Sequence, residues 1–518
     1  MRYLMAAVSL LCALPAAAQQ SRCEDLNKFS IQNIAVKSAV VVRAGPFRLP
    51  SASADAAPVT VPEFCRVTAV VKPELNLELW LPAQWNRKYI AVGNGGLAGS
   101  IVHGAMVDPL NRGYATSSTD TGHMGANTND GTWALGHMDR VINFGQRGVH
   151  EMAMASKAII NAYYGVAPAH SYFTGCSHGG KQAFTEVQKY PADFDGVIAG
   201  DPAHWWTRHY TGGHIWMAQA VDGDGWLPPA KVQLLGDAVN AACDALDGVK
   251  DGVLNDPRKC QYDPGTLQCK SGDAPGCLTT AQVEAVRKLW TGPRDAAGHS
   301  LYPGLERGGE AGPGGWVRWV TGATPGTGSH AGLGVPFMKY VVYEDPNWDF
   351  RKFRLTGAPG LESDLEYTDD KVGRIFDSID PDLSEFRARG GKLIQYHGFS
   401  DPDIPPANSI NYYESVVRAV GGKRNSARAL EETKEFHRLF MVPGMQHCTG
   451  GPGTSQFDAL KALEEWVEQK KAPEQLLGSR VVNGKVDRTR PICAYPMEAK
   501  YKGTGSTDDA VNFTCALP

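Results

Sequence analysis

The sequence predicts an α/β fold in which helices cover a mostly parallel β-sheet. Apolar stretches of strand length alternate with longer stretches of helical pattern from about residue 75 to 204, and the alternation returns after residue 387. Between these regions the pattern breaks into a segment rich in glycine, proline, tryptophan and cysteine. We therefore expect a core of alternating strands and helices that is split by one large insertion.

The first half of this core is expected to contain four strands and two helices. Residues 76–81 alternate between apolar and polar side chains, and residues 89–92 form a short apolar strand that leads into the glycine-rich stretch 93–96. The pattern then predicts a helix over 149–164, a strand over 170–174, a helix over 181–190 and a strand over 196–199.

The second half follows the insertion. The pattern predicts a strand over 393–396, a helix over 409–420, a strand over 439–442 and a helix over 457–469. A chain of 518 residues is longer than one compact core normally holds. We divide it into a signal peptide at 1–18, a core made of 19–204 and 388–518, and an inserted lid domain at 205–387.

The N-terminus predicts export. Arg2 is followed by an apolar run over 5–14 and by the small residues 16–18, which is typical of a cleaved signal peptide and of a secreted or periplasmic protein. No later stretch of about 20 apolar residues follows, so we expect no membrane anchor. The net charge is −4 and basic residues form no block, which argues against a nucleic-acid partner.

Ten of the 11 cysteines follow the signal peptide, an even number that suggests up to five disulfides in an exported chain. The sequence alone leaves the connectivity open. Local spacing favours three pairs: Cys243 with Cys260, Cys269 with Cys277 and Cys493 with Cys515. Cys23 with Cys65 would tie the N-terminal arm, which leaves Cys176 and Cys448 as the last pair.

A candidate nucleophile lies between a predicted strand and a predicted helix. Residues 175–179 read Gly-Cys-Ser-His-Gly, which places Ser177 in a G-x-S-x-G motif. In a strand-turn-helix setting, such a motif forces the serine into a tight turn at the N-terminus of a helix. A glycine-rich turn that merely contains serine is the alternative. The setting favours an α/β-hydrolase core with Ser177 as nucleophile.

A serine nucleophile needs a base and an orienting carboxylate, which follow it in the order acid, then histidine, in this type of core. His447 lies in the loop after the last predicted strand, and Asp401 lies in the loop after the preceding strand. Asp403 is the rival acid, and we favour Asp401. His397 and His437 are interpreted as structural histidines.

Backbone amides are the expected donors of an oxyanion hole. The N–H of His178 follows the nucleophile, and the second donor is expected in the glycine-rich stretch, at Gly95 or Gly96. A simple tight turn is the alternative for this stretch. Cys176 precedes the nucleophile and Cys448 follows the base, so a disulfide between them would fix the distance between the two loops.

The insertion contains a candidate metal site. Three carboxylates within eight residues, together with glycines that let carbonyl groups turn inward, suit a hard cation, and most plausibly Ca²⁺. A solvated acidic turn is the alternative. The expected ligands are the side chains of Asp244, Asp247 and Asp251 and the carbonyl groups of Val249 and Val253.

On these motifs the sequence resembles the tannase and feruloyl esterase family, whose members place one cysteine beside the catalytic serine and another beside the catalytic histidine. The matching positions are Cys176–Ser177, Asp401 and His447–Cys448, and they extend to the acidic loop and the cysteine spacings. The resemblance implies an α/β-hydrolase core, a lid, a structural calcium ion and small-molecule esters of aromatic acids, of hydroxycinnamic or gallic type, as substrates.

Two alternatives stay open at this point. The family also includes hydrolases of terephthalate monoesters, one of which holds the free carboxylate with a lid arginine, and residues 319–350 contain no arginine. A fold of this class can also serve as a non-catalytic binding protein. Four tryptophans of the insertion are candidates for stacking on an aromatic acyl group, unless they only fill the lid's own core: Trp205, Trp206, Trp316 and Trp319.

Overall fold

The structure is a computed structural model that describes residues 16–53, 55–357, 362–423 and 426–518. Residues 1–15 of the predicted signal peptide lie outside the described residues. The chain divides into two compact units. The first consists of Met1–Val92, Ile101–Thr119 and Glu151–Ser171, and the second of Gly93–Ser100, Asp120–His150 and Tyr172–Pro518.

The first unit contains an antiparallel set of strands in the order β1-β2-β5-β6-β8, with β7 added parallel to β8. The disulfide Cys23–Cys65 joins its N-terminal helix α1 to β5. Its strands are β1 (Ser30–Ile31), β2 (Ile34–Val42), β3 (Gly45–Phe47), β4 (Val59–Val61), β5 (Phe64–Val71), β6 (Leu75–Pro82), β7 (Lys88–Val92) and β8 (Ala115–Thr119). Its helices are α1 (Ala16–Asp25), α2 (His103–Asn111) and most of α4 (Gly148–Tyr164).

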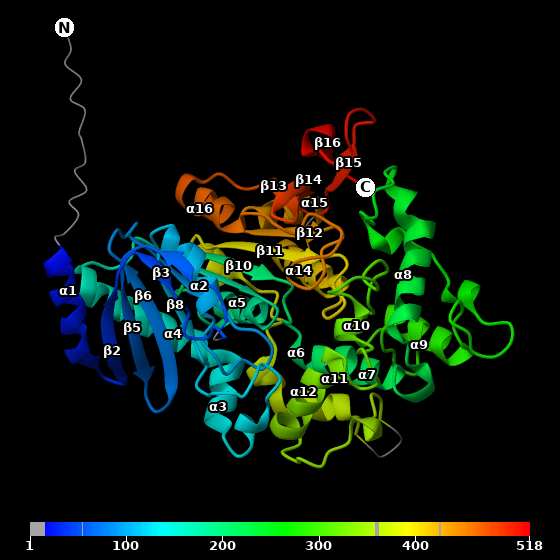
Figure 1. Cartoon of the computed structure of the whole chain (residues 1–518), viewed down its shortest axis with the longest axis horizontal. Helices are drawn as coiled ribbons and strands as arrows, with labels where there is room; N and C mark the ends of the chain where they lie inside the picture. The colour runs from blue at the N-terminus through cyan, green and yellow to red at the C-terminus, as the bar shows by residue number, and fades with distance from the viewer. Residues whose placement is uncertain (1–15, 54, 358–361, 424–425) are drawn as a thin grey trace, which may run out of the picture. The chain divides into compact units, whose positions relative to one another are not determined.

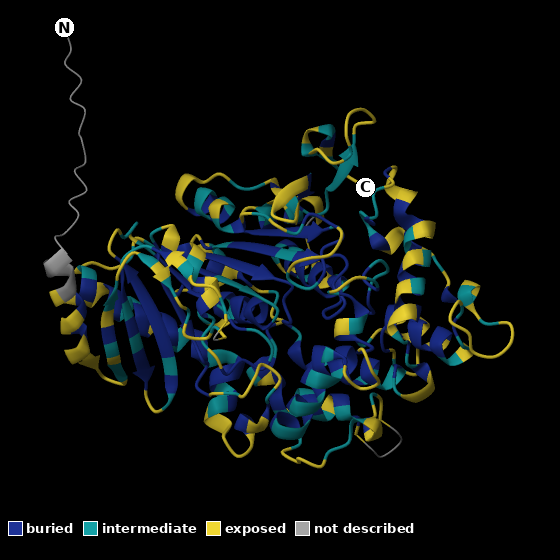
Figure 2. Cartoon of the chain, in the orientation of Figure 1, coloured by how far each residue is buried: buried dark blue, intermediate teal, exposed yellow. Residues whose placement is uncertain are grey.

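The second unit is built on four parallel strands in the order β9-β10-β11-β12. Figure 2 shows that these strands are mostly buried, and every residue of β10 and β12 is buried, which explains why apolar residues and glycine predominate in them. Their bounds are β9 (His170–Cys176), β10 (Gly196–Gly200), β11 (Lys392–Gly398) and β12 (His437–Val442).

Helices connect and cover these strands (Figure 1). Helix α5 joins β9 to β10, α14 and α15 join β11 to β12, and α16 follows β12 and packs on β10 and β11. Helix α14 begins at a proline of the first turn, where a missing N–H removes no intrahelical bond. The bounds are α5 (His178–Lys189), α14 (Pro406–Gly421), α15 (Ser426–Lys434) and α16 (Ala459–Gln469).

The predicted insertion, 205–387, connects β10 to β11 and lies wholly in the second unit. Its interior is a hydrophobic cluster that includes Trp206, Trp316 and Phe337. Its main segments are α6 (Trp206–Arg208), the π-helix η4 (His209–Ile215), α7 (Trp216–Ala220), α8 (Pro229–Cys243), α9 (Thr280–Thr291), α10 (Trp316–Trp319), α11 (Ser329–Pro336), the π-helix η9 (Phe337–Val342), α12 (Asp364–Phe376) and α13 (Ser384–Ala388).

The C-terminal part of the chain forms two β-hairpins. They are formed by β13 (Gln475–Val482) with β14 (Lys485–Cys493) and by β15 (Glu498–Tyr501) with β16 (Phe513–Ala516). The structure contains the five disulfides expected in the sequence analysis, Cys493–Cys515 between β14 and β16 among them. Within the described part of the chain, no helix combines the length and the apolar character needed to cross a bilayer.

Candidate active site

Ser177 is the single residue between β9 and α5. Its backbone adopts φ 65° and ψ −121°, a strained conformation for a residue with a side chain. The turn is this tight because the two neighbouring glycines touch: a Cβ on Gly175 would lie 2.6 Å from the backbone of Gly179. The strand extends to Cys176 and the helix begins at His178, so both elements are longer than the sequence pattern indicated.

The candidate acid and base follow two further strands of the same parallel set. Asp401 lies after β11 and His447 after β12, while Ser177 follows β9. Because the carboxyl ends of parallel strands meet at one edge of a sheet, the three side chains belong to the same edge. His447 Nδ1 lies 2.9 Å from Asp401 Oδ2. The structure therefore joins the predicted acid to the predicted base.

Asp401 is fully buried and is held from several sides. Its Oδ1 accepts hydrogen bonds from the backbone N–H groups of Asp403 at 2.8 Å and Ile404 at 3.1 Å. Burial alone would raise the pKa of Asp401, but His447 and His397 outweigh burial and hold this pKa well below its ordinary value. Asp401 is thus ionised and can stabilise an imidazolium ion at His447.

His447 is surrounded by carboxylates. Burial would lower its pKa, but Asp401 and Asp403 together outweigh burial and raise the pKa of His447 to about 9. Its Nε2 is buried and has no hydrogen-bond partner among the described residues. This nitrogen is therefore available to a serine hydroxyl. Asp403 Oδ2 lies 3.5 Å from it, so the rival acid of the sequence analysis approaches the opposite side of the ring from Asp401.

The disulfide Cys176–Cys448 joins the residue before the candidate nucleophile to the residue after the candidate base. The two Cα atoms lie 5.9 Å apart, and 272 residues separate the cysteines in the sequence. The bridge therefore ties the elbow to the loop after β12 and fixes the residues next to both candidate side chains.

The glycine-rich stretch packs directly against the elbow. A Cβ on Gly93 would lie 2.8 Å from Gly179 Cα, and Asn94 exchanges hydrogen bonds with the Gln182 side chain. Gly96 has φ +53°, whereas Gly95 faces open space. His178 is the first residue of α5, where helix geometry supplies no acceptor for its N–H. These amides are thus placed near the candidate nucleophile.

The four tryptophans of the insertion have different surroundings. Trp206 and Trp316 are fully buried in the hydrophobic cluster, so they fill the core of the insertion. Trp319 packs edge-on against His447, with ring centroids 4.6 Å apart. Trp205 is partly buried and lies beneath the Arg208 guanidinium. Trp319 is therefore the tryptophan that reaches the candidate base.

The predicted cation loop brings most of its expected ligands to one place. Asp247, Val249, Asp251 and Val253 line one small cavity. Burial and the nearby charges of Asp251 and Asp244 raise the pKa of Asp247, as expected for carboxylates gathered without enough positive charge. Asp244 lies beside this cavity, and its Oδ1 accepts hydrogen bonds from the N–H groups of Asp251 and Gly252. Oxygen donors of this kind fit a calcium ion.

One difference from the sequence interpretation concerns the same loop. Arg490 from β14 donates to Asp251 Oδ2 at 2.5 Å, and Arg488 donates to the Asp251 carbonyl group at 3.1 Å. These cations come from a hairpin that the sequence pattern did not reveal. They supply part of the positive charge that the three carboxylates require.

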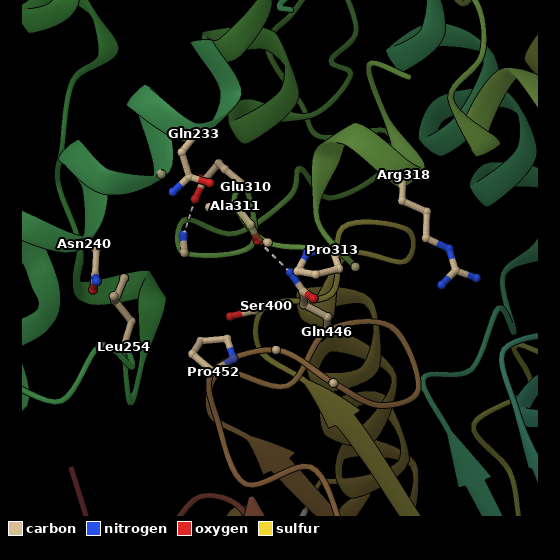
Figure 3. A pocket seen from close by; sticks show the side chains of 18 of the residues that line it. Gln233, Asn240, Leu254, Glu310, Ala311, Pro313, Arg318, Ser400, Gln446 and Pro452 are labelled. Carbon is tan, nitrogen blue, oxygen red and sulfur yellow. Dashed lines mark hydrogen bonds between the residues drawn. The ribbon is translucent and has the colours of Figure 1, made fainter. Parts of the chain in front are cut away.

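A cavity of about 690 Å³ lies beside the loops of the candidate acid and base. Ser400 and Gln446, which precede Asp401 and His447, belong to its lining, together with Glu310 and Arg318 of the insertion. Figure 3 shows Gln446 hydrogen-bonded to the Ala311 carbonyl group, while the Arg318 side chain lies apart from these two residues. No side chain of Ser177, Asp401 or His447 lines the cavity, so it flanks the candidate site and does not contain it.

Asp201 is a buried acid that the sequence analysis missed. It follows β10, so it lies at the same edge as the other candidate residues, and its Oδ1 accepts from the Gly398 N–H at 2.8 Å. Burial raises its pKa to about 7. Its position after a strand was the only available signal, and the same signal applies to many loop carboxylates.

The geometry defines an α/β-hydrolase fold with a serine elbow and a histidine–carboxylate pair at one sheet edge. Comparison with known proteins then gives the family, because the family model "Tannase and feruloyl esterase" matches residues 59–516. The chain belongs to this family and is a carboxylic ester hydrolase. The non-catalytic alternative therefore has no support.

Individual relatives extend over nearly the whole chain. Feruloyl esterase B of Aspergillus niger is 32% identical over 544 residues, which cover 99% of this chain and 100% of the relative. Mono(2-hydroxyethyl) terephthalate hydrolase of Piscinibacter sakaiensis is 31% identical, with 97% of this chain and 92% of the relative covered. The crystal structure of feruloyl esterase B from Aspergillus oryzae is 27% identical, covers 96% of this chain and 100% of that chain, and gives a TM-score of 0.86.

Proposed function

We propose that this chain is an exported serine esterase that hydrolyses esters of aromatic acids, of hydroxycinnamic or gallic type, through an acyl-enzyme. The observation that carries the mechanism is the arrangement of His447, which is bonded to Asp401 through Nδ1 and has Nε2 without a partner. Its loop is tied by a disulfide to the residue before Ser177. The names of the relatives support the substrate class.

In this mechanism His447 Nε2 takes the proton of the Ser177 hydroxyl as Oγ attacks the ester carbonyl carbon. Asp401 keeps the imidazole in the tautomer that exposes Nε2 and stabilises its positive charge. The N–H of His178 and that of Gly95 or Gly96 bind the oxyanion. His447 then gives the proton to the leaving alcohol, and water repeats the sequence to release the acid.

The test of the substrate class is a panel of four esters compared by kcat/KM: methyl ferulate, methyl gallate, a terephthalate monoester and a short aliphatic ester. We expect methyl ferulate or methyl gallate to have the highest value. Trp319, the aromatic side chain that touches His447, is a candidate surface for the aromatic ring. A clear preference for the aliphatic ester would refute the aromatic substrate and leave the serine mechanism intact.

A terephthalate monoester is the second candidate substrate. One relative is named for such a hydrolase, and Arg318 offers a cation next to the site, since its guanidinium lies 5.1 Å from the centre of the Trp319 ring. This arginine precedes the stretch 319–350, which contains none. Loss of activity on the monoester alone in Arg318→Ala would favour this candidate.

We also propose that the acidic loop of the insertion holds a structural calcium ion. Asp244, Asp247 and Asp251 would supply side-chain oxygens, and Val249 and Val253 carbonyl oxygens. A bound cation would offset the repulsion among the three carboxylates and hold the loop to β14. No ligand of the ion comes from the loops of Ser177, Asp401 or His447, so the ion takes no part in ester cleavage.

Chelation should therefore lower stability before it affects chemistry. A cation that binds only the folded state at about 100 times its Kd contributes about 2.7 kcal/mol, so its removal should lower Tm by about 2–3 °C in a chain of this length. Thermal unfolding with EDTA and with added Ca²⁺ measures this shift. Asp247→Asn should reduce the response, whereas the control Asp263→Asn, an exposed carboxylate of the same insertion, should keep it. An unchanged Tm would contradict the proposal.

We also propose that the chain divides into a catalytic core and a lid. A further proposal is that the chain is exported. Five disulfides are expected in an oxidising compartment and support export. With removal of the predicted signal peptide, the secreted or periplasmic chain begins near Gln19. N-terminal sequencing of the exported protein checks this, and an intact Met1 would contradict it.

A further inference from the structure

We propose that Asp403 is a second carboxylate of the active site, which acts on the Nε2 side of His447 and is held there by His214 directly and by His330 through the carbonyl group of Pro402. This inference rests on the proposed role of His447 as the base. It assigns a function to Asp403 and to two histidines of the insertion. None of them belongs to the proposed catalytic residues Ser177, His447 and Asp401.

The geometry places Asp403 between the base and the insertion. Its Oδ2 lies 3.5 Å from His447 Nε2, the nitrogen that exchanges the proton. Its Oδ1 lies 2.9 Å from His214 Nε2 and 3.6 Å from His330 Nε2. The Asp403 N–H donates to Asp401 Oδ1 at 2.8 Å. Asp401 thus lies next to Nδ1 of His447 and Asp403 lies next to Nε2. A hydrogen bond from the backbone of Asp403 to the side chain of Asp401 links the two acids.

The negative charge of Asp403 interacts mainly with His447, because the other side chains paired with Asp403 are neutral. A carboxylate only accepts hydrogen bonds, so His214 donates from Nε2. His330 Nε2 donates to the Pro402 carbonyl group at 3.0 Å. Burial lowers the pKa of both histidines to about 3, which keeps both rings uncharged. Within the described part of the chain, Asp403 forms ion pairs with histidines alone, and His447 is the one of them that can carry charge.

The residues around Asp403 come from unusual local structure. His214 lies in the π-helix η4, a rare geometry that occurs frequently at functional sites. His330 comes from α11, and its ring stacks on that of His214 with centroids 4.9 Å apart. All three side chains are almost completely buried. Two separate segments of the insertion therefore converge on one carboxylate beside the base.

The chemical role follows from the proton transfer. When Ser177 attacks, its O–H bond breaks, the Oγ–carbon bond forms and the proton moves to Nε2, which makes His447 an imidazolium ion. Asp403 stabilises that charge in the transition state, as Asp401 does from the other side. It also stabilises the protonated resting base, so activity requires a higher pH than a single carboxylate would impose.

Several other charged or titratable groups face His447 and must be kept constant in a test. Asp201 adds a further attraction, while His397 lies beside Asp401 at 3.2 Å. His209 and His214 of η4 and His330 of α11 approach from the insertion. None of these is altered in Asp403→Asn, which removes one charge and preserves the shape of the side chain.

The pH dependence of kcat/KM tests the proposal. A base with a raised pKa becomes active only as pH rises through that pKa, so the wild type should lose activity as pH falls below about 9. Asp403→Asn should move this limb to lower pH by about 1–3 units and lower the alkaline plateau. Asp403→Glu keeps the negative charge, so its pH limb should lie between those of Asp403→Asn and the wild type. An unmoved limb in Asp403→Asn would overturn the inference.

A second measurement does not depend on catalysis. In Ser177→Ala, the titration of the His447 imidazole can be followed by NMR, alone and combined with Asp403→Asn. The midpoint should fall by about 1–3 pH units in the combined variant. The matched control is Asp377→Asn, which removes a buried carboxylate of the insertion that bonds Thr207. If the midpoint falls but the wild type cleaves no ester, the proposed function fails and the effect of Asp403 stands. An unchanged midpoint would overturn the inference in either case.

Discussion

Ser177→Ala should lower kcat by on the order of 10³-fold or more and leave the protein folded. The substitution removes the oxygen that forms the acyl-enzyme. An alanine accepts the same strained backbone angles as the serine, so the elbow needs no rearrangement. Steady-state kinetics on the preferred ester of the panel, together with Tm, measures both parts of this expectation.

His447→Ala should cause a loss of similar size. Because nucleophile and base act as one unit, the double variant should be no slower than either single variant by more than a small factor. Ser384→Ala, which changes an exposed serine of α13, is the control and should keep full activity. Near-normal turnover in Ser177→Ala would refute the mechanism, whatever the substrate.

The strand and helix pattern of the second unit could be predicted because its elements are buried in regular ways. Strands β9 to β12 are short apolar runs, and α5, α14 and α16 follow them with helical spacing. The boundaries shift by up to three residues, as at α5, which begins at His178 rather than near 181. The glycines of its first turn weakened the helical signal, although they are needed for close packing against Gly93 and Gly200.

Other strands carry no such signal. Strand β8, Ala115–Thr119, is made mostly of hydroxyl side chains and yet is completely buried. Three of its four hydroxyl groups have specific partners: Ser117 bonds the Tyr89 hydroxyl at 2.7 Å, Ser118 accepts from the Val102 N–H, and Thr119 donates to the Asn76 carbonyl group. A polar stretch that is buried by hydrogen bonding cannot be distinguished from a loop by its periodicity. The C-terminal hairpins were missed for a related reason, since most of their residues are not buried.

The residues of the candidate site also fall into those that the sequence could predict and those that it could not. Ser177, Asp401 and His447 could be named because chain order and motif limit the choice in this type of fold. Asp403 was weighed only as a rival of Asp401, because a sequence cannot show that two acids approach opposite sides of one ring. His214 and His330 come from the insertion, whose path over the core follows no periodic pattern. Their contribution becomes visible only through the contacts at Asp403.

The second large effect is expected at the disulfide Cys176–Cys448, beside the candidate nucleophile and base. Cys176→Ala with Cys448→Ala should lower kcat by about 10- to 100-fold, since a displacement of about 1 Å between nucleophile and base is enough for such a loss. The bridge should also contribute more to stability than the other four. In the chain-entropy model, a closed loop of 272 residues corresponds to about 5.6 kcal/mol, against about 2.5 kcal/mol for the loop of 8 residues at Cys269–Cys277.

The double variant Cys269→Ala with Cys277→Ala is the matched control, because it removes one disulfide of the same protein far from the loops of Ser177 and His447 in the sequence. It should lower Tm slightly and leave kcat unchanged. The comparison separates geometry from stability when both variants are assayed well below their own Tm. If the Cys176 and Cys448 variant is destabilised but keeps full kcat there, the bridge serves only stability. If peptide mapping shows both thiols free in the active wild type, the bridge has no role in fixing the distance between Ser177 and His447.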